Sequence, residues 1–139
     1  MIVVYFRSLV AKGQAADKLG GNAPKAANMY KMKYDCEIEK IAARHAAKCV
    51  FAHSTNAERE NNGENLYMRM PPTDDVTKMA GNAADAWFAE LEKYGVGQEN
   101  VFTMALANRQ GMMIGHYTQV SSYNFIKGHI LKMLKLHSF

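Results

Sequence analysis

The segment 73–95 carries the pattern that most restricts how this chain can fold. Its apolar residues recur at steps of three and four, the period of an α-helix with one buried face. The residues on that face are Val76, Ala80, Ala83, Trp87, Leu91 and Tyr94. Residues 73–75, Thr-Asp-Asp, supply capping side chains and early negative charge, and Gly95 supplies a C-terminal stop. We therefore predict a helix over about residues 74–94, with Glu90 at the edge of its buried face.

Two further segments have helical spacing. A short helix is predicted over residues 3–12, with Tyr5, Phe6, Leu9 and Val10 as its apolar positions. A longer helix is predicted over residues 27–51, with a core face formed by Tyr34, Ile38, Ile41, Ala42, His45 and Cys49. Residues 52–72 contain several breakers and are predicted to be an ordered irregular loop, which in a small domain is usually functional. Residues 100–110 are predicted to form a short helix or strand.

Length and composition limit the class of protein. With 139 residues, of which 48% are hydrophobic and 22% charged, the chain fits one ordinary globular domain. No apolar run reaches the roughly 18 residues that a membrane-spanning helix needs, and the opening MIVVYF is not a complete secretory signal. The net charge of +4 comes from lysines interleaved with acids, which predicts a mildly basic solvated surface and no nucleic-acid partner.

The two cysteines, Cys36 and Cys49, both fall within the predicted helix 27–51. At 1.5 Å per residue, one helix would hold their Cα atoms about 19 Å apart, too far for a disulfide between them. Two alternatives remain from the sequence: two buried free thiols of a cytosolic protein, or two half-disulfides whose partners lie outside this chain.

The last segment, residues 121–139, changes character. Its irregular alternation of apolar residues with lysines is typical of a basic amphipathic helix, so contact with a membrane surface is one alternative for it. We therefore divide the chain into a domain over residues 1–120 and a divergent basic tail over residues 121–139.

Four polar residues stand at structurally special places. They are His53 after the second helix, Glu64 in Gly-Glu-Asn, Glu90 on the third helix and His116 after Gly115. Two imidazoles and two carboxylates suit a divalent metal or acid–base chemistry. The serine-nucleophile, phosphate-loop, dinucleotide and paired-cysteine motifs are all missing, which excludes the enzyme classes with strong local signatures.

Four strings give the chain a family resemblance. HAAKCVFAHS, GENLY, AWFAEL and GHYTQV occur in the order and spacing of the CAP superfamily, also called the SCP or TAPS domain. The pieces YDCEIEKIAARHAAKC and YGVGQENVFTMAL are most similar to the activation-associated secreted proteins, or venom-allergen-like proteins, of parasitic nematodes. The resemblance covers about residues 5–120.

The resemblance implies an α/β fold, a three-layer α-β-α sandwich whose cleft carries a His-Glu-Glu-His tetrad. The matching residues in this sequence are His53, Glu64, Glu90 and His116. It further implies that His53 and His116 can bind Zn²⁺, that no residue is catalytic, and that the protein is secreted. The implied partners are a host protein, in immune modulation, or a sterol or lipid. The alternative is a zinc-dependent hydrolase or protease that uses the same cleft.

The sequence also departs from this family pattern. After GHYTQV the family continues with cysteine-bearing strands, whereas residues 121–139 show none of these, so we expect a sandwich truncated after that motif. The resemblance also implies that Cys36 and Cys49 are disulfide-type cysteines, whose partners this chain lacks. His45 matches no tetrad position and is interpreted as a packed or capping histidine.

Overall fold

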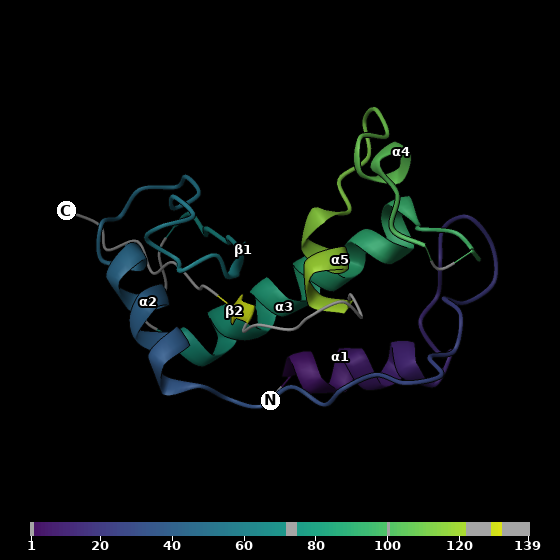
Figure 1. Ribbon diagram of the computed structural model, residues 1–139, viewed down its shortest axis with the longest axis horizontal. Helices are drawn as coiled ribbons and strands as arrows, with labels where there is room; N and C mark the ends of the chain where they lie inside the picture. The colour runs from purple at the N-terminus through teal and green to yellow at the C-terminus, as the bar shows by residue number, and fades with distance from the viewer. Residues whose placement is uncertain (1, 72–74, 100, 122–128, 132–139) are drawn as a thin grey trace. The chain divides into compact units, whose positions relative to one another are not determined.

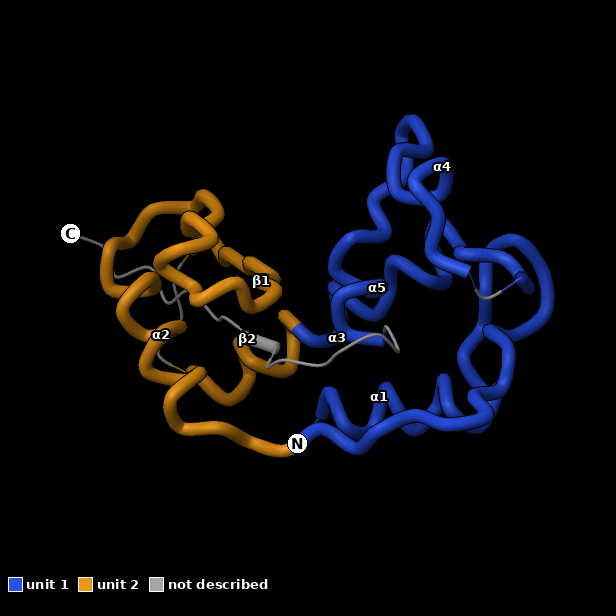
Figure 2. Tube along the Cα trace, in the orientation of Figure 1, with its two compact units in different colours: residues 1–32, 84–123 blue, residues 33–83, 124–139 orange. Residues whose placement is uncertain are grey.

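The computed structural model describes residues 2–71, 75–99, 101–121 and 129–131. The chain forms two compact units, each assembled from two stretches of sequence (Figure 2). Unit 1 comprises residues 1–32 and 84–123, and unit 2 comprises residues 33–83 and 124–139. Among the described residues, no helix has both the length and the apolar character needed to cross a membrane.

Unit 1 is helical (Figure 1). It contains α1 (Ile2–Ala11), the later part of α3 (Val76–Tyr94), α4 (Met104–Ala107) and α5 (Gly115–Ser121), and α1 packs against α5. The helices predicted over residues 3–12 and 74–94 are confirmed to within two residues at each end. Of the two alternatives for residues 100–110, the short helix is correct, since α4 lies there.

The core of unit 1 contains residues from both of the stretches of sequence that form the unit. Its buried members are Val10, Ala15, Ala23, Leu91 and Tyr117. Beside this cluster, Phe88 stacks on Phe6 with ring centroids 4.3 Å apart. Phe88 also meets Tyr117 edge-on, with ring centroids 5.9 Å apart. Trp87 and Leu91 are almost fully buried, which confirms the central part of the predicted face of α3.

The buried face of α1 differs from the predicted one. It consists of Val3, Arg7 and Val10, and Tyr5 is exposed. Arg7 Nη1 donates to the backbone oxygen of Val120 at 2.6 Å, and its Nη2 donates to that of Tyr30 at 2.8 Å. Burial lowers the pKa of Arg7, because desolvation disfavours the charged guanidinium.

The turn after α3 depends on Gly95. Its φ of +71° lies in the left-handed region, and a Cβ there would come within 2.8 Å of the backbone nitrogen of Leu19. The neighbouring Asp17 carboxylate accepts hydrogen bonds from backbone N–H groups of Leu19 at 2.8 Å, Val96 at 3.1 Å and Gly97 at 3.0 Å. Gly95 therefore allows the loop after α1 to close on the end of α3.

Unit 2 combines α2 (Cys36–Ala46), the start of α3 and two short parallel strands, β1 (Gly63–Asn65) and β2 (His129–Leu131). In this pairing Glu64 of β1 lies opposite Ile130 of β2. α2 packs against β2. The amphipathic helix expected over residues 121–139 is wrong for residues 129–131, which form a strand. The rest of that prediction from residue 122 onward lies outside the described residues.

The helix predicted over residues 27–51 is much shorter in the structure. Asp35 is its N-cap, and the Asp35 carboxylate accepts from the backbone N–H groups of Glu37 and Ile38, so α2 starts there. After the helix ends, Cys49 has a φ of 52°, which no helix can contain. Consequently one helix does not carry both cysteines. The separation of about 19 Å between their Cα atoms, which assumed a single helix, does not apply.

Two other predicted core positions are wrong. Tyr34 precedes α2 and is exposed, because the N-cap at Asp35 leaves it outside the helix. Val76 is the first residue of α3, and it is half exposed because the buried stretch of this helix starts at Met79.

Candidate functional site

His53 and Glu64 form a pair in unit 2. His53 lies in the irregular backbone after α2, and Glu64 is the central residue of β1. Glu64 Oε1 accepts from His53 Nδ1 at 2.9 Å and from the backbone N–H of Ser54 at 2.8 Å. Glu64 Oε2 accepts from the Ser54 hydroxyl at 2.8 Å. One buried carboxylate therefore fixes two consecutive residues of the loop.

These contacts determine which ring nitrogen of His53 is available. A carboxylate oxygen accepts, so Nδ1 of His53 carries the hydrogen and donates it. The Glu64 side chain is only 1% exposed, whereas that of His53 is 64% exposed. Nε2 of His53 is thus the nitrogen left to bind a ligand, and Glu64 sets the orientation of the ring.

Residues outside the predicted tetrad support this pair. His45 is buried, as interpreted, and its Nε2 lies 2.7 Å from the backbone oxygen of Ala52, the residue before His53. On the other side, Arg59 donates to the backbone oxygen of Ser54. The loop is thereby fixed on both sides of His53. The sequence signal for His45 was its place on the apolar face of the helix predicted over residues 27–51.

Glu58 reinforces the same loop. Its carboxylate pairs with Lys48 and accepts from both the backbone N–H and the hydroxyl of Thr55. The Lys48 contact, followed by those of Thr55, lowers the pKa of Glu58 to about 2.

Glu90 and His116 form the second pair, in unit 1. Glu90 lies on α3 and is buried, as its place beside the predicted core face suggested. Glu90 Oε1 is 2.6 Å from His116 Nδ1, and Oε2 accepts from the backbone N–H of Tyr117 at 2.9 Å. The His116 ring stacks on Trp87, with centroids 6.1 Å apart and planes 19° apart. Here the imidazole is 30% exposed and the carboxylate 8% exposed.

The two pairs use the same pattern. In each, a buried glutamate binds Nδ1 of a histidine and the backbone N–H of the residue that follows it. Each pair therefore holds one imidazole ring in a fixed orientation. The four predicted residues are brought together two by two, each pair within its own unit. In the described part of the chain, no three His, Cys, Asp or Glu side chains form a group that could hold a metal.

The remaining predicted residues lie outside both pairs. Cys36 is exposed and Cys49 is half-buried, and both are free thiols in this structure. Tyr94 at the end of α3 is half-buried, and Trp87 is in the core and also supports His116.

Comparison with known protein families shows to which family the chain is related. The family model described as CAP, cysteine-rich secretory protein family, matches residues 4–126. The chain belongs to the CAP family. The resemblance found in the sequence motifs over residues 5–120 is therefore confirmed, with nearly the same limits.

Individual CAP proteins are similar over most of this chain. The Ancylostoma secreted protein of Ancylostoma caninum is 53% identical over 116 residues, which cover 84% of this chain and 27% of that protein. The structure of the hookworm protein Na-ASP-1 matches with a TM-score of 0.83 and 52% identity, over 86% of this chain and 30% of its own. NaASP2, solved with Zn²⁺, matches with a TM-score of 0.80 and 48% identity, over 86% of this chain and 61% of its own.

These matches confirm the predicted fold class, since CAP domains are α-β-α sandwiches. The described part of this CAP chain is mostly helical, with two short strands. The chain spans less than two thirds of each of these three relatives.

Proposed function

We propose that this chain is the CAP domain of a secreted, non-enzymatic binding protein in which His53 and His116 are ligands for a divalent metal of the zinc class. The observation that carries the proposal is the shared geometry of the two pairs. In each, a buried glutamate binds Nδ1 of the histidine and so fixes the orientation of the imidazole ring.

A carboxylate behind a histidine is the usual outer-shell arrangement of protein zinc sites. The carboxylate fixes the tautomer, orients the ring and makes the free nitrogen a better ligand. Glu64 and Glu90 suit this role better than direct coordination, because their oxygens already accept hydrogen bonds from the protein.

Two features support a binding role over hydrolysis. Glu64 already accepts three hydrogen bonds, which makes its carboxylate a weak candidate for the base that a hydrolase requires. The Ser54 hydroxyl donates its hydrogen to a carboxylate that already binds His53, which makes this hydroxyl a weak candidate for a nucleophile. A bound divalent ion would supply open coordination positions for an oxygen or nitrogen atom of a partner.

The family relationship supports the remaining parts of the proposal. A relative with 53% identity is named a secreted protein, and the solved relative NaASP2 was crystallised with Zn²⁺. Secretion of this chain and a host protein, sterol or lipid as its partner belong to the same proposal.

Calorimetric titration of the full chain with Zn²⁺ tests the metal site. We expect Zn²⁺ binding that is strongly weakened in His53→Ala and in His116→Ala. His137→Ala, which removes an imidazole outside both pairs, is the matched control and should bind like the parent chain.

Two results would contradict the proposal. The first is Zn²⁺ binding that is unchanged in both His53→Ala and His116→Ala, which would show that neither imidazole is a ligand. The second is loss of binding in Cys36→Ser/Cys49→Ser while both histidine variants still bind, because thiolates would then be the ligands.

A further inference from the structure

The net charge of the chain is concentrated in its first 32 residues. They contain one arginine and four lysines against a single acid, Asp17, and so carry all of the net charge of +4. Asp17 is buried, and its carboxylate already accepts from three backbone N–H groups. The four lysines, at positions 12, 18, 25 and 31, are all exposed. This part of unit 1 therefore presents charge of one sign to the solvent.

Two of these lysines lie together where α1 ends. Lys12 directly follows the last residue of α1. The backbone N–H of Ala26 donates to the oxygen of Ala11 at 3.2 Å, which brings the segment around residue 25 back to this point. A Cβ at Gly13 would lie 3.4 Å from the Cβ of Lys25, so the two stretches of backbone are in van der Waals contact. Lys12 and Lys25 are therefore neighbours in space.

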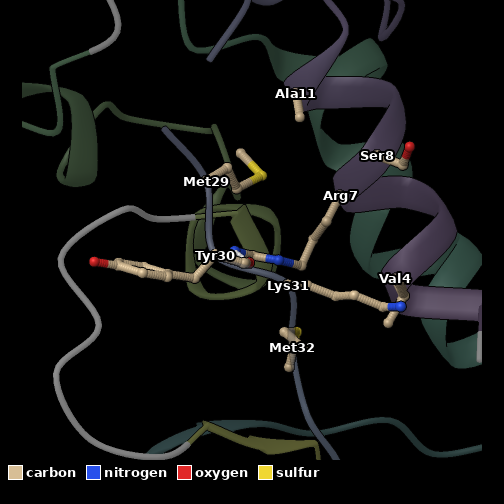
Figure 3. Close-up of a pocket in the computed structure, with 8 residues that line it drawn as sticks. All are labelled: Val4, Arg7, Ser8, Ala11, Met29, Tyr30, Lys31 and Met32. Atoms are coloured by element: carbon tan, nitrogen blue, oxygen red, sulfur yellow. Dashed lines mark hydrogen bonds between the residues drawn. The ribbon is translucent and has the colours of Figure 1, made fainter. Parts of the chain in front are cut away.

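Lys31 lies beside the same helix, nearer to its start. The backbone oxygen of Tyr30 accepts from Arg7 at 2.8 Å, so the chain runs back along α1 between residues 26 and 30. Lys31 lines a pocket of about 380 Å³ with Val4 and, in Figure 3, reaches across it toward α1. The seven residues from Val4 to the end of α1 span about 10 Å along the helix axis. The three lysines are thus distributed along one helix.

Lys12, Lys25 and Lys31 form what we call the basic row. Lysines of unit 2 are compensated locally, since Lys40 pairs with Glu37 and Lys48 pairs with Glu58. The sequence around the basic row offers no such acid, because neither α1 nor residues 18–34 contain an aspartate or glutamate. A linear polymer with repeated negative charges would compensate all three lysines at once.

We propose that the basic row binds a sulfated polysaccharide. Sulfate groups of one part of the polymer contact Lys12 and Lys25, and those of another part contact Lys31. The pocket beside Lys31 forms a recess for one sugar unit, to which Ser8 offers a hydroxyl. The exposed ring of Tyr30 adds an aromatic face with a polar tip beside Lys31. This site lies within unit 1 and uses neither histidine pair.

Two arguments favour a polysaccharide over other polyanions. A membrane-surface site inserts apolar side chains next to its lysines. Beside Lys31, however, Met29 and Met32 are half-buried, and the exposed side chain is that of Tyr30. The choice over a nucleic acid rests on the secretion proposed above, because sulfated polysaccharides are the abundant linear polyanions outside cells.

The probe is a heparin octasaccharide, titrated into the full chain by calorimetry at about 0.15 M NaCl, where distant charges are screened. We expect saturable binding that weakens as NaCl is added. Lys12→Ala, Lys25→Ala and Lys31→Ala should each weaken it about threefold, and the triple variant at least about tenfold. The matched control is Lys40→Ala/Lys78→Ala/Lys93→Ala, which removes the same net charge from exposed lysines outside the basic row and should bind like the parent chain.

Three results would overturn the proposal. The first is an equal loss of affinity in the two triple variants, because binding would then follow net charge alone. The second is no binding up to about 1 mM octasaccharide. The third is equal binding of a desulfated octasaccharide, which we expect to bind at least about tenfold more weakly because it keeps only its carboxylates.

Two further probes separate the alternative partners. They are vesicles of phosphatidylserine and phosphatidylcholine, and single-stranded oligothymidylate. If either binds the basic row more tightly than the octasaccharide does, the partner is a membrane or a nucleic acid and the polysaccharide proposal is wrong. Zn²⁺ binding by the triple variant of the basic row should equal that of the parent chain, so failure of this proposal and failure of the metal site are distinguishable.

Discussion

The Glu90–His116 pair and the Glu64–His53 pair share one hydrogen-bond pattern but are held by different kinds of backbone. The first pair lies on α3 and α5, with Trp87 against the imidazole. The second pair joins a loop to a three-residue strand, and its imidazole is about twice as exposed, at 64% against 30%.

The difference shows two ways of orienting a histidine. Around His116 the surroundings are apolar and helical, so packing restricts the ring. Around His53 the surroundings are polar, and hydrogen bonds from Ser54, Arg59 and His45 restrict the loop. We therefore expect changes in packing to affect the first pair and changes in polar contacts to affect the second.

The largest expected effect is that of Trp87→Ala. It removes a fully buried aromatic side chain and the ring that stacks on His116, so the free energy of unfolding should fall by about 3–5 kcal/mol. Urea denaturation followed by circular dichroism measures this change. The matched control is Phe51→Ala, near His53, because Phe51 is exposed and its loss should cost less than about 0.5 kcal/mol. An equal loss of unfolding free energy in Trp87→Ala and Phe51→Ala would contradict this difference between the two pairs.

Glu64→Ala should have the next largest effect. It leaves the backbone N–H and the hydroxyl of buried Ser54 without their acceptor, at a cost of about 2–3 kcal/mol. It also frees the His53 ring, so NMR of the imidazole nitrogens should show a mixture of tautomers at His53 and none of this change at His116. Glu60→Ala, on an exposed side chain of the same loop, is the control and should change neither quantity. An unchanged His53 spectrum in Glu64→Ala would show that something else fixes this ring.

Much of α3 and its site residue could be predicted from the sequence. Trp87, Ala83 and Leu91 carry a clear helical period, Gly95 ends the helix, and Glu90 beside that face is buried. Local pattern was sufficient because the same residues determine both the helix and its packing. The identities of the four site residues came from sequence motifs, since their spacing along the chain is not diagnostic by itself.

Other features depend on contacts that no local pattern reveals. The apolar period continues on both sides of α2. The helix nevertheless starts at Cys36, because the Asp35 side chain caps it there. The partners of Arg7 are backbone oxygens 23 and 113 residues away in sequence. The pairing of Glu64 with His53 and Ser54 likewise depends on how a loop returns to a strand.

Ser54→Ala sharpens the comparison with a smaller effect. The variant loses only the hydroxyl bond to Glu64, at about 1 kcal/mol, and keeps the backbone N–H bond. The corresponding position after His116 is Tyr117, which reaches Glu90 through its backbone alone. Imidazole NMR should therefore show a change at His53 in Ser54→Ala and no change at His116 in Tyr117→Phe. A change at His116 in Tyr117→Phe would show that the Tyr117 hydroxyl also helps to orient the ring.

The smallest expected effect is a response of the loop around His53 to acid. Lys48 and Thr55 stabilise the charged form of Glu58 and lower its pKa from the ordinary value of 4.5 to about 2. A carboxylate with a lowered pKa in the folded state contributes stability that is complete above about pH 4.5 and is lost as the pH falls toward about 2.

The amide proton of Thr55, which donates to Glu58, reports this change directly by NMR. Its shift should titrate with a midpoint near 2, and in Lys48→Ala the midpoint should move up toward 4.5, because the largest contribution to the lowered pKa is removed. Lys40→Ala, which removes a lysine that pairs with Glu37 on α2 instead, should leave the midpoint unchanged. A midpoint already near 4.5 in the parent chain would show that the Lys48 and Thr55 contacts to Glu58 do not persist in solution. The contacts of Glu58 would then not help to hold the His53 loop, whose orientation would depend on the contacts of Glu64, His45 and Arg59.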